Sequence, residues 1–155
     1  MSRHVSLKLT RRQALASALG GTAVLATSQT LSAPALGQEV KPFRIGVIND
    51  QNGPYSGVGG PGSVEAAKLA VEEFGGKVLG RSIEVLVGDH QNKPDLGAAI
   101  ARGWLDSGVS AIADGASSAV GVAIQTLARE RNRTFLISGS TTSDLYGKLC
   151  SPCSV

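Results

Sequence analysis

Two short segments rich in hydroxyl side chains are the parts of this sequence best suited to bind a small charged molecule. In the first, Ser117 and Ser118 follow a Gly-Ala pair; in the second, Gly139 and Thr141 lie in a run of Ser, Thr and Gly. Hydroxyl and backbone N–H groups can donate to a carboxylate, and hydroxyl and carbonyl oxygens can accept from an ammonium. The two segments together therefore predict a site for a small zwitterion.

Ser117 and Ser118 directly precede a stretch in which apolar residues recur at helical spacing. Backbone N–H groups at the start of a helix have no intrahelical partner, and the helix dipole adds positive potential there, so an anion is favoured. A serine in this place can also cap the helix through its own hydroxyl. Both interpretations, ligand contact and capping, are open from the sequence.

A glycine-rich segment offers a competing interpretation. It matches the dinucleotide-binding pattern G-x-G-x-x-G at Gly57, Gly59 and Gly62. That pattern needs its first glycine at the tight turn directly after a strand, whereas the preceding apolar run ends at Ile48. A flexible loop at the edge of a cleft, or plain turn chemistry, explains the glycines as well. Tyr55 and Ser56 are the side chains of this segment best able to contact a ligand.

The elements that must position these segments are indicated by an alternating pattern. Four short apolar runs rich in Ile, Val and Leu predict strands, at residues 43–48, 83–87, 109–113 and 134–137. Three stretches with helical spacing separate them and begin near Pro61, Pro94 and Ser117. This order predicts an α/β fold with a parallel sheet of about four strands and helices on both faces. Such sheets bind ligands beyond the carboxyl ends of their strands, where the two hydroxyl-rich segments are expected to lie side by side if their strands are adjacent.

The amino-terminal segment predicts export. Residues 1–37 combine a basic start, a mildly apolar middle and small residues around Gly37, the expected cleavage point. Arg11-Arg12 resembles the twin-arginine signal of bacteria, although Ala14 stands where that signal prefers Phe, so ordinary secretion is open as well. The apolar part is too short and too diluted by Gly and Thr for a spanning helix. We therefore expect a cleaved signal peptide and a mature protein in the periplasm.

The net charge gives no reason to expect a nucleic-acid partner. The chain carries 15 Lys and Arg against 12 Asp and Glu, but four of the basic residues and none of the acidic ones precede residue 38. Cleavage there leaves a nearly neutral chain with few aromatic residues. The sequence then offers neither a basic patch for phosphates nor an aromatic platform for bases.

The remaining reactive residues indicate structure rather than catalysis. Cys150 and Cys153 form a C-x-x-C pair, but a redox cysteine needs a helix start or a nearby cation to lower its pKa, and only two residues follow. We expect a structural disulfide, either local or to a missing partner. His90 has no partner at metal-ligand spacing and is expected in a surface loop. The sequence therefore predicts no metal, no cofactor and no enzymatic centre.

Four motifs, taken in their order along the chain, resemble a known family. They are RIGVI at residues 44–48, GPYSG at 53–57, GASS at 115–118 and STTSDL at 140–145. Together they resemble the amino-terminal lobe of type I periplasmic solute-binding proteins, the branched-chain amino-acid-binding family of ABC importers, over residues 42–150. The resemblance implies two α/β lobes that close on a ligand and bind it without chemistry.

The resemblance also implies roles for individual residues. It makes Ser117 a carboxylate donor, with Ser118 as the alternate, Gly139 a backbone contact and Thr141 a side-chain contact. It implies a small amino acid or amide-like ligand, an ABC permease of the inner membrane as partner, and a monomer when full length. Residues 38–155 then form one lobe, and the second lobe is missing. The alternative is an exported nucleotide-dependent oxidoreductase that uses the glycine pattern.

Overall fold

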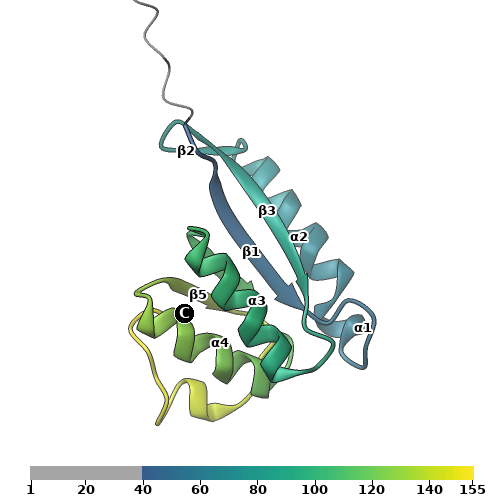
Figure 1. The fold of residues 1–155 in the computed structure, drawn as a ribbon. Coiled ribbons are helices and arrows are strands. Elements are labelled where there is room, and N and C mark those ends of the chain that lie inside the picture. Colours follow the sequence, from purple (N-terminus) through teal and green to yellow (C-terminus); the bar gives the residue numbers. More distant parts are fainter. Residues whose placement is uncertain (1–39) are drawn as a thin grey trace, which may run out of the picture. The chain divides into compact units, whose positions relative to one another are not determined.

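Strands and helices alternate along residues 40–155, the part of the chain that this computed structural model describes (Figure 1). In chain order the elements are β1 (Phe43–Asn49), α1 (Ser56–Gly59), α2 (Pro61–Glu73), β2 (Lys77–Val78), β3 (Arg81–Asp89), α3 (Pro94–Asp106), β4 (Ala111–Asp114), α4 (Ser118–Glu130), β5 (Thr134–Ile137) and the 3-10 turn η1 (Ser143–Leu145). The predicted signal, residues 1–37, lies outside the described residues. Between residues 40 and 155, no helix has the length and apolar character that a bilayer crossing requires.

The sheet has the strand order β2-β3-β1-β4-β5. β1 pairs in parallel with both β3 and β4, and β4 pairs in parallel with β5. The α/β fold predicted from the sequence is thereby confirmed. The short strand β2, which pairs antiparallel to β3, was not predicted. It forms because Leu79 and Gly80 both have positive φ angles, of 50° and 75°, which reverse the chain in a tight hairpin.

The prolines and glycines mark the helix ends as predicted. α2 begins at Pro61 and α3 at Pro94, where a proline loses no hydrogen bond. After α2, Gly75 and Gly76 adopt φ angles of 93° and 68°, and the Gly76 N–H donates to the Val71 carbonyl at 2.8 Å. This left-handed turn satisfies a carbonyl of the last helical turn and directs the chain toward β2.

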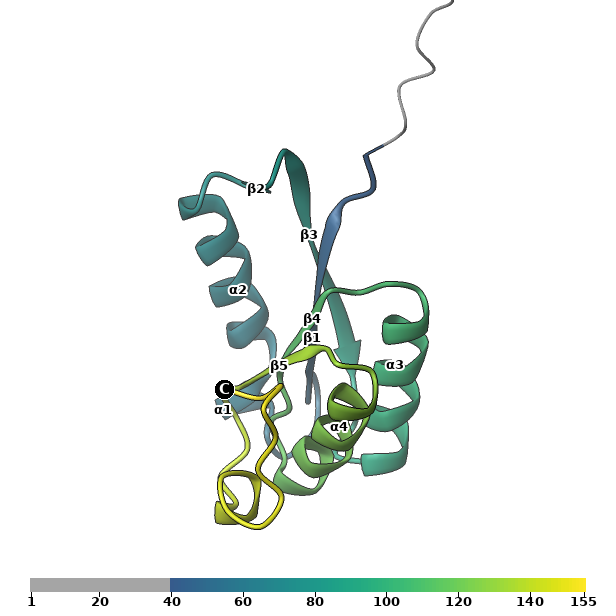
Figure 2. The same cartoon turned by 90° about the vertical axis from the view of Figure 1, so that its left-hand side faces the viewer.

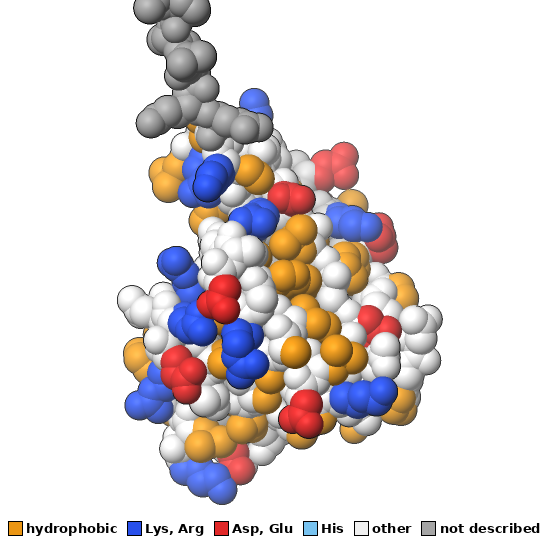
Figure 3. Space-filling view, viewed as in Figure 1, with side chains coloured by type: hydrophobic (Ala, Val, Ile, Leu, Met, Phe, Trp, Pro, Cys, Tyr) orange, Lys and Arg blue, Asp and Glu red, His pale blue; other side chains and the backbone are white. Residues whose placement is uncertain are grey.

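Helices cover the two faces of the sheet unequally (Figures 1 and 2). α3 and α4 lie on one face, and α2 lies on the other. The apolar core lies beneath α3 and α4, where strand residues such as Ile48, Ile112 and Phe135 are fully buried against Ile124 of α4. The view of this side shows apolar side chains gathered between interspersed positive and negative ones (Figure 3).

The face under α2 is open by comparison. A groove of about 380 Å³ runs between α2 and the strands, with Phe43, Ile83 and Leu136 among its lining residues. The side chains of Leu136 and Val87 are 42% and 45% exposed. One helix therefore does not cover the apolar side chains that the sheet presents on this face.

The end of the described chain returns to the sheet beside β5. The Phe135 N–H donates to the Cys153 carbonyl at 2.9 Å, and the Val155 N–H donates to the Phe135 carbonyl at 3.1 Å. Residues 153–155 therefore run parallel to β5 and cover its outer edge. The buried Gln125 of α4 holds the preceding segment, because its amide N–H donates to the Leu149 carbonyl.

Candidate functional site

The loops that follow β1, β4 and β5 meet at the carboxyl edge of the sheet, because β4 lies between β1 and β5. The loops after β4 and β5 are joined directly. The Ser140 hydroxyl donates to the Gly115 carbonyl at 2.5 Å and lies 3.2 Å from the Ser117 carbonyl. The Thr141 N–H donates to the Ser118 hydroxyl oxygen at 3.3 Å. The prediction that the two hydroxyl-rich segments lie side by side is confirmed.

Small residues make this close approach possible. Gly121 of α4 faces Ser140, and a Cβ at Gly121 would occupy the space of the Ser140 hydroxyl. Gly139 fits in the same way: a Cβ there would lie 2.7 Å from the Ala116 Cα. Any larger residue at either glycine would force the loops apart.

Ser117 and Ser118 stand at the start of α4 as predicted. Ser117 precedes the first helical residue with an extended backbone, φ −119°, and its side chain makes no capping hydrogen bond. The capping interpretation is therefore wrong for the Ser117 hydroxyl. Ser117 is buried and Ser118 is half-buried, whereas Thr141 is exposed. Ser117 thus directly precedes the first N–H groups of α4, which have no intrahelical partner.

The loop after β1 is organised by turn chemistry around a buried carboxylate, whereas its flexibility stays a prediction. Asp50 is fully buried and accepts from the Gly53 and Tyr55 N–H groups, both at 2.9 Å. The Ser56 hydroxyl donates to the Gly53 carbonyl at 2.7 Å, and the short helix α1 follows. Such side-chain bonds to nearby backbone N–H groups fix a turn without regular secondary structure.

Tyr55 and Ser56 follow β1, at the same edge of the sheet as the hydroxyl-rich loops. Among the described residues, no hydrogen bond joins their side chains to Ser117, Ser118 or Thr141. The contact between these loops is made instead at Gly59, where a Cβ would lie 2.7 Å from that of Ala116.

The glycine pattern does not have the geometry of a dinucleotide-binding turn. Gly57 and Gly59 lie within α1, and Gly62 lies within the first turn of α2. The turn that directly follows β1 is instead the one held by Asp50. A pyrophosphate site needs the first glycine at that turn.

His90 is buried, and its predicted place in a surface loop is wrong. Its ring is fully inaccessible, Nδ1 accepts from the Asn92 N–H at 2.9 Å, and Nε2 has no partner among the described residues. Burial lowers the pKa of His90, and the negative charges of Asp50, Asp89 and Asp114 offset this only in part. The ring is therefore neutral, with the proton on Nε2.

Asp89 holds the same turn from the other side. Burial alone would raise its pKa, but hydrogen bonds from the Gln91 and Gln51 N–H groups outweigh burial and lower it. These N–H groups lie 2.9 Å and 3.2 Å from the Asp89 carboxylate. Asp89 thus connects the loop after β1 to the turn after β3.

A comparison with protein families decides the identity of this fold. The model of a periplasmic binding protein family matches residues 42–155. The chain belongs to this family. No curated protein sequence matches the chain.

Solved structures of the periplasmic binding protein fold support the assignment. A periplasmic binding protein from Burkholderia mallei is 38% identical, with a TM-score of 0.73, over 74% of this chain and 31% of that protein. A branched-chain amino acid ABC transporter periplasmic ligand-binding protein from Burkholderia xenovorans is 34% identical, with a TM-score of 0.68, over 71% of this chain and 30% of that protein.

A third structure adds a bound ligand. An ABC transporter solute-binding protein from Rhodopseudomonas palustris, in complex with 3,4-dihydroxybenzoic acid, is 25% identical, with a TM-score of 0.65, over 74% of this chain and 31% of that protein. The chain thus spans about a third of the length of these periplasmic binding proteins.

Several residues that organise the edge in this family member were not singled out from the sequence. They are Asn49, Asp50, Asp114 and Ser140. Each follows or ends a predicted strand, and that position is the signal that could have found them. Their burial was the missing information, since polar residues after strands are ordinarily exposed loop residues.

The two cysteines are free thiols in the structure. Cys150 is exposed, and the Cys153 thiol lies 3.5 Å from the Asn132 side-chain oxygen. The disulfide therefore stays a prediction. Within the described part of the chain, no three His, Cys, Asp or Glu side chains converge as metal ligands would.

Proposed function

We propose that this chain forms the amino-terminal lobe of an exported solute-binding protein of an ABC importer. In this proposal Ser117, Ser118 and Thr141 hold the carboxylate end of a small amino acid or amide-like ligand, and Gly139 contributes a backbone contact. The observation that supports it best is the direct contact between the loops after β4 and β5, which brings these hydroxyl groups to one place.

Neutral donors suit a ligand that must be released again. The hydroxyls and the first N–H groups of α4 attract a carboxylate without the desolvation of an Arg or Lys. The acidic side chains at this edge are already engaged: Asp50 accepts from backbone N–H groups, and Asp114 accepts from Asn49. The site therefore binds reversibly, and we assign it no chemical step and no cofactor.

The ligand class follows from the chemistry that these donors recognise. A carboxylate is common to amino acids and to 3,4-dihydroxybenzoic acid, the ligand of the Rhodopseudomonas palustris protein. In our proposal residues 38–155 form one lobe, which binds the carboxylate of the ligand. A second lobe completes the pocket for the rest of the ligand. The full-length protein is then a periplasmic monomer, exported by a signal cleaved after Gly37, that delivers its ligand to an inner-membrane permease.

Nuclear magnetic resonance titration of the chain tests the proposal, because it detects the weak binding expected of one lobe. We expect L-leucine, L-glutamine or 3,4-dihydroxybenzoate to shift the amide signals of Ser117, Ser118, Gly139 and Thr141. NADH should leave these signals unchanged. Shifts caused by NADH alone, centred on the glycines of α1, would instead support the oxidoreductase.

Substitution of the hydroxyl groups gives the quantitative test. Ser117→Ala and Thr141→Ala should each weaken ligand binding by about 1 to 3 kcal/mol, because each leaves a ligand oxygen without its donor. Ser107→Ala, at the opposite edge of the sheet after α3, serves as the matched control and should change nothing. Equal affinity in all three variants would place the ligand elsewhere.

A further inference from the structure

Asp114, the last residue of β4, combines burial with an unusual backbone conformation. It is 2% exposed, and its φ angle of 84° lies in the left-handed region that residues with a side chain rarely adopt. Gly115 follows with a φ angle of 71°. Strain of this kind persists only where surrounding contacts hold it, and it is concentrated at functional sites.

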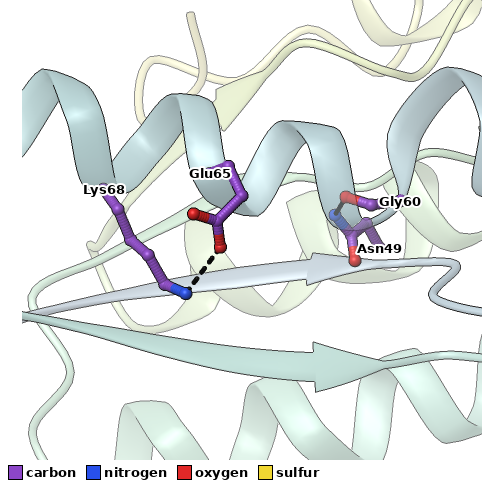
Figure 4. Close-up of polar contacts among 4 residues, drawn as sticks. All are labelled: Asn49, Gly60, Glu65 and Lys68. Carbon is purple, nitrogen blue, oxygen red and sulfur yellow. Dashed lines mark hydrogen bonds and ion pairs between the residues drawn. The ribbon is translucent and has the colours of Figure 1, made fainter.

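The carboxylate of Asp114 is held by neutral groups. Within residues 40–155, no ion pair includes it. One oxygen, Oδ2, accepts from the Asn49 amide at 3.1 Å. That amide also donates to the Gly60 carbonyl at 2.8 Å, and Figure 4 shows the Asn49 side chain at the end of β1 directed at Gly60. Asp114 is thereby connected through Asn49 to the start of α2.

The other oxygen, Oδ1, faces the loop after β5. It accepts from the Ser138 hydroxyl at 3.3 Å. The next residue, Gly139, lies so close that a Cβ there would be 2.5 Å from Oδ1. The loop that carries Thr141 therefore contacts this carboxylate through Ser138 and Gly139.

The third loop at the edge is the continuation of β4 itself. The left-handed turn at Asp114 and Gly115 leads to Ala116, which packs against both Gly59 and Gly139. Ser117 and Ser118 follow directly. One carboxylate thus lies where the loops after β1, β4 and β5 meet.

We propose that Asp114 is the positioning residue of the binding site: its buried carboxylate holds these three loops in the one arrangement in which Ser117, Ser118 and Thr141 reach the same ligand. This inference rests on the proposed function for its ligand, but the ordering of the loops can be measured without one. A buried carboxylate without a cation is costly. The preformed loops offset this cost, because a ligand then binds without having to order them.

Two variants of Asp114 separate positioning from simple backbone strain. Glycine adopts the φ angle of 84° without penalty, and Asn49 keeps its bond to Gly60, so Asp114→Gly removes the carboxylate while relieving the backbone. Asparagine can still accept from Asn49 and can donate to the Ser138 hydroxyl, and it tolerates left-handed φ angles. We expect Asp114→Gly to weaken binding of L-leucine, L-glutamine or 3,4-dihydroxybenzoate at least about tenfold, and Asp114→Asn to stay within about threefold of the parent chain.

The same experiment includes a readout without ligand. Amide hydrogen exchange of residues 138–141 and 53–60 should become faster in Asp114→Gly, whereas exchange within α3 should not change. If Asp114→Gly fails to fold, Ser138→Ala replaces it, since it removes only the bond to Oδ1 from an exposed residue; about threefold weaker binding is expected.

The outcomes distinguish this inference from the proposed function. If the parent chain binds and Asp114→Gly, or its replacement Ser138→Ala, binds equally well, the positioning role is overturned and the proposed function stands. If the parent chain binds none of the three ligands, the proposed function fails, and exchange alone decides: unchanged exchange in residues 138–141 overturns the positioning role, and faster exchange supports it.

Discussion

On one face of the sheet α3 and α4 bury a continuous apolar cluster, whereas on the other face α2 alone leaves strand side chains open to solvent. Strands present Ile and Phe on both faces, so the type of apolar residue does not explain the difference. The number of helices on each face explains it, because one helix can cover only part of a sheet five strands wide. The stability of residues 40–155 therefore depends mainly on the face under α3 and α4. Ser118, a residue of the proposed site, is the first residue of α4.

The largest expected effect compares one phenylalanine from each face. Phe135→Ala should lower the free energy of unfolding by about 3 to 5 kcal/mol, because Phe135 is fully buried in the cluster. Phe74→Ala, at the end of α2, should change it by no more than about 0.5 kcal/mol, since Phe74 is 67% exposed. Urea unfolding measures both. Equal losses would show that the two faces contribute alike.

Two glycines of α3 test how closely α3 and α4 pack on the closed face, the sheet face that these two helices cover. A Cβ at Gly97 would lie 2.7 Å from a methyl carbon of Val120 on α4, so Gly97→Ala should destabilise the fold by about 1 to 3 kcal/mol. A Cβ at Gly103 meets nothing within 4 Å, and alanine is the better helix former, so Gly103→Ala should stabilise by up to about 1 kcal/mol. Thermal unfolding measures both changes. A shift of the unfolding temperature in the same direction for both variants would contradict the close contact of α3 and α4.

The smallest effect is a pH dependence confined to the closed face, where His90 lies against α3. The pKa of His90 is lowered from 6.5 in the folded state, so below pH 6.5 the unfolded chain takes up a proton that the folded chain does not. Stability should be constant above pH 6.5 and fall below it by up to about 1.4 kcal/mol per pH unit, until the lowered pKa is passed.

Urea unfolding at several pH values between 5 and 8 tests this prediction. The lowered pKa of Asp89 acts only below its ordinary value of 3.8 and does not enter this range. The other histidine, His4, precedes residue 38, so a chain that starts there contains His90 alone. In that chain His90→Gln should show no slope between pH 5 and 6.5, and an equal slope in both proteins would rule out His90 as the cause.

The sequence predicted the parallel strands closely and failed where contacts between distant loops decide. Prolines and apolar spacing marked α2 and α3, because both signals act within a few residues. β2 was missed because its turn begins at Leu79, which is not a typical turn residue. The place of Ser117 and Ser118 beside Thr141 was predicted, because loops after neighbouring parallel strands meet at one edge.

By itself, the chain of residues determined the alternation of elements and the presence of hydroxyl groups after the strands, since both depend on local patterns. Folding in three dimensions determined which polar residues are buried. His90 and Asp114 are polar residues of types common in exposed loops. Both are buried, because the strand order β3-β1-β4-β5 brings the loops after these strands together. Burial depends on neighbours far away in sequence, and for this reason no local pattern reveals it.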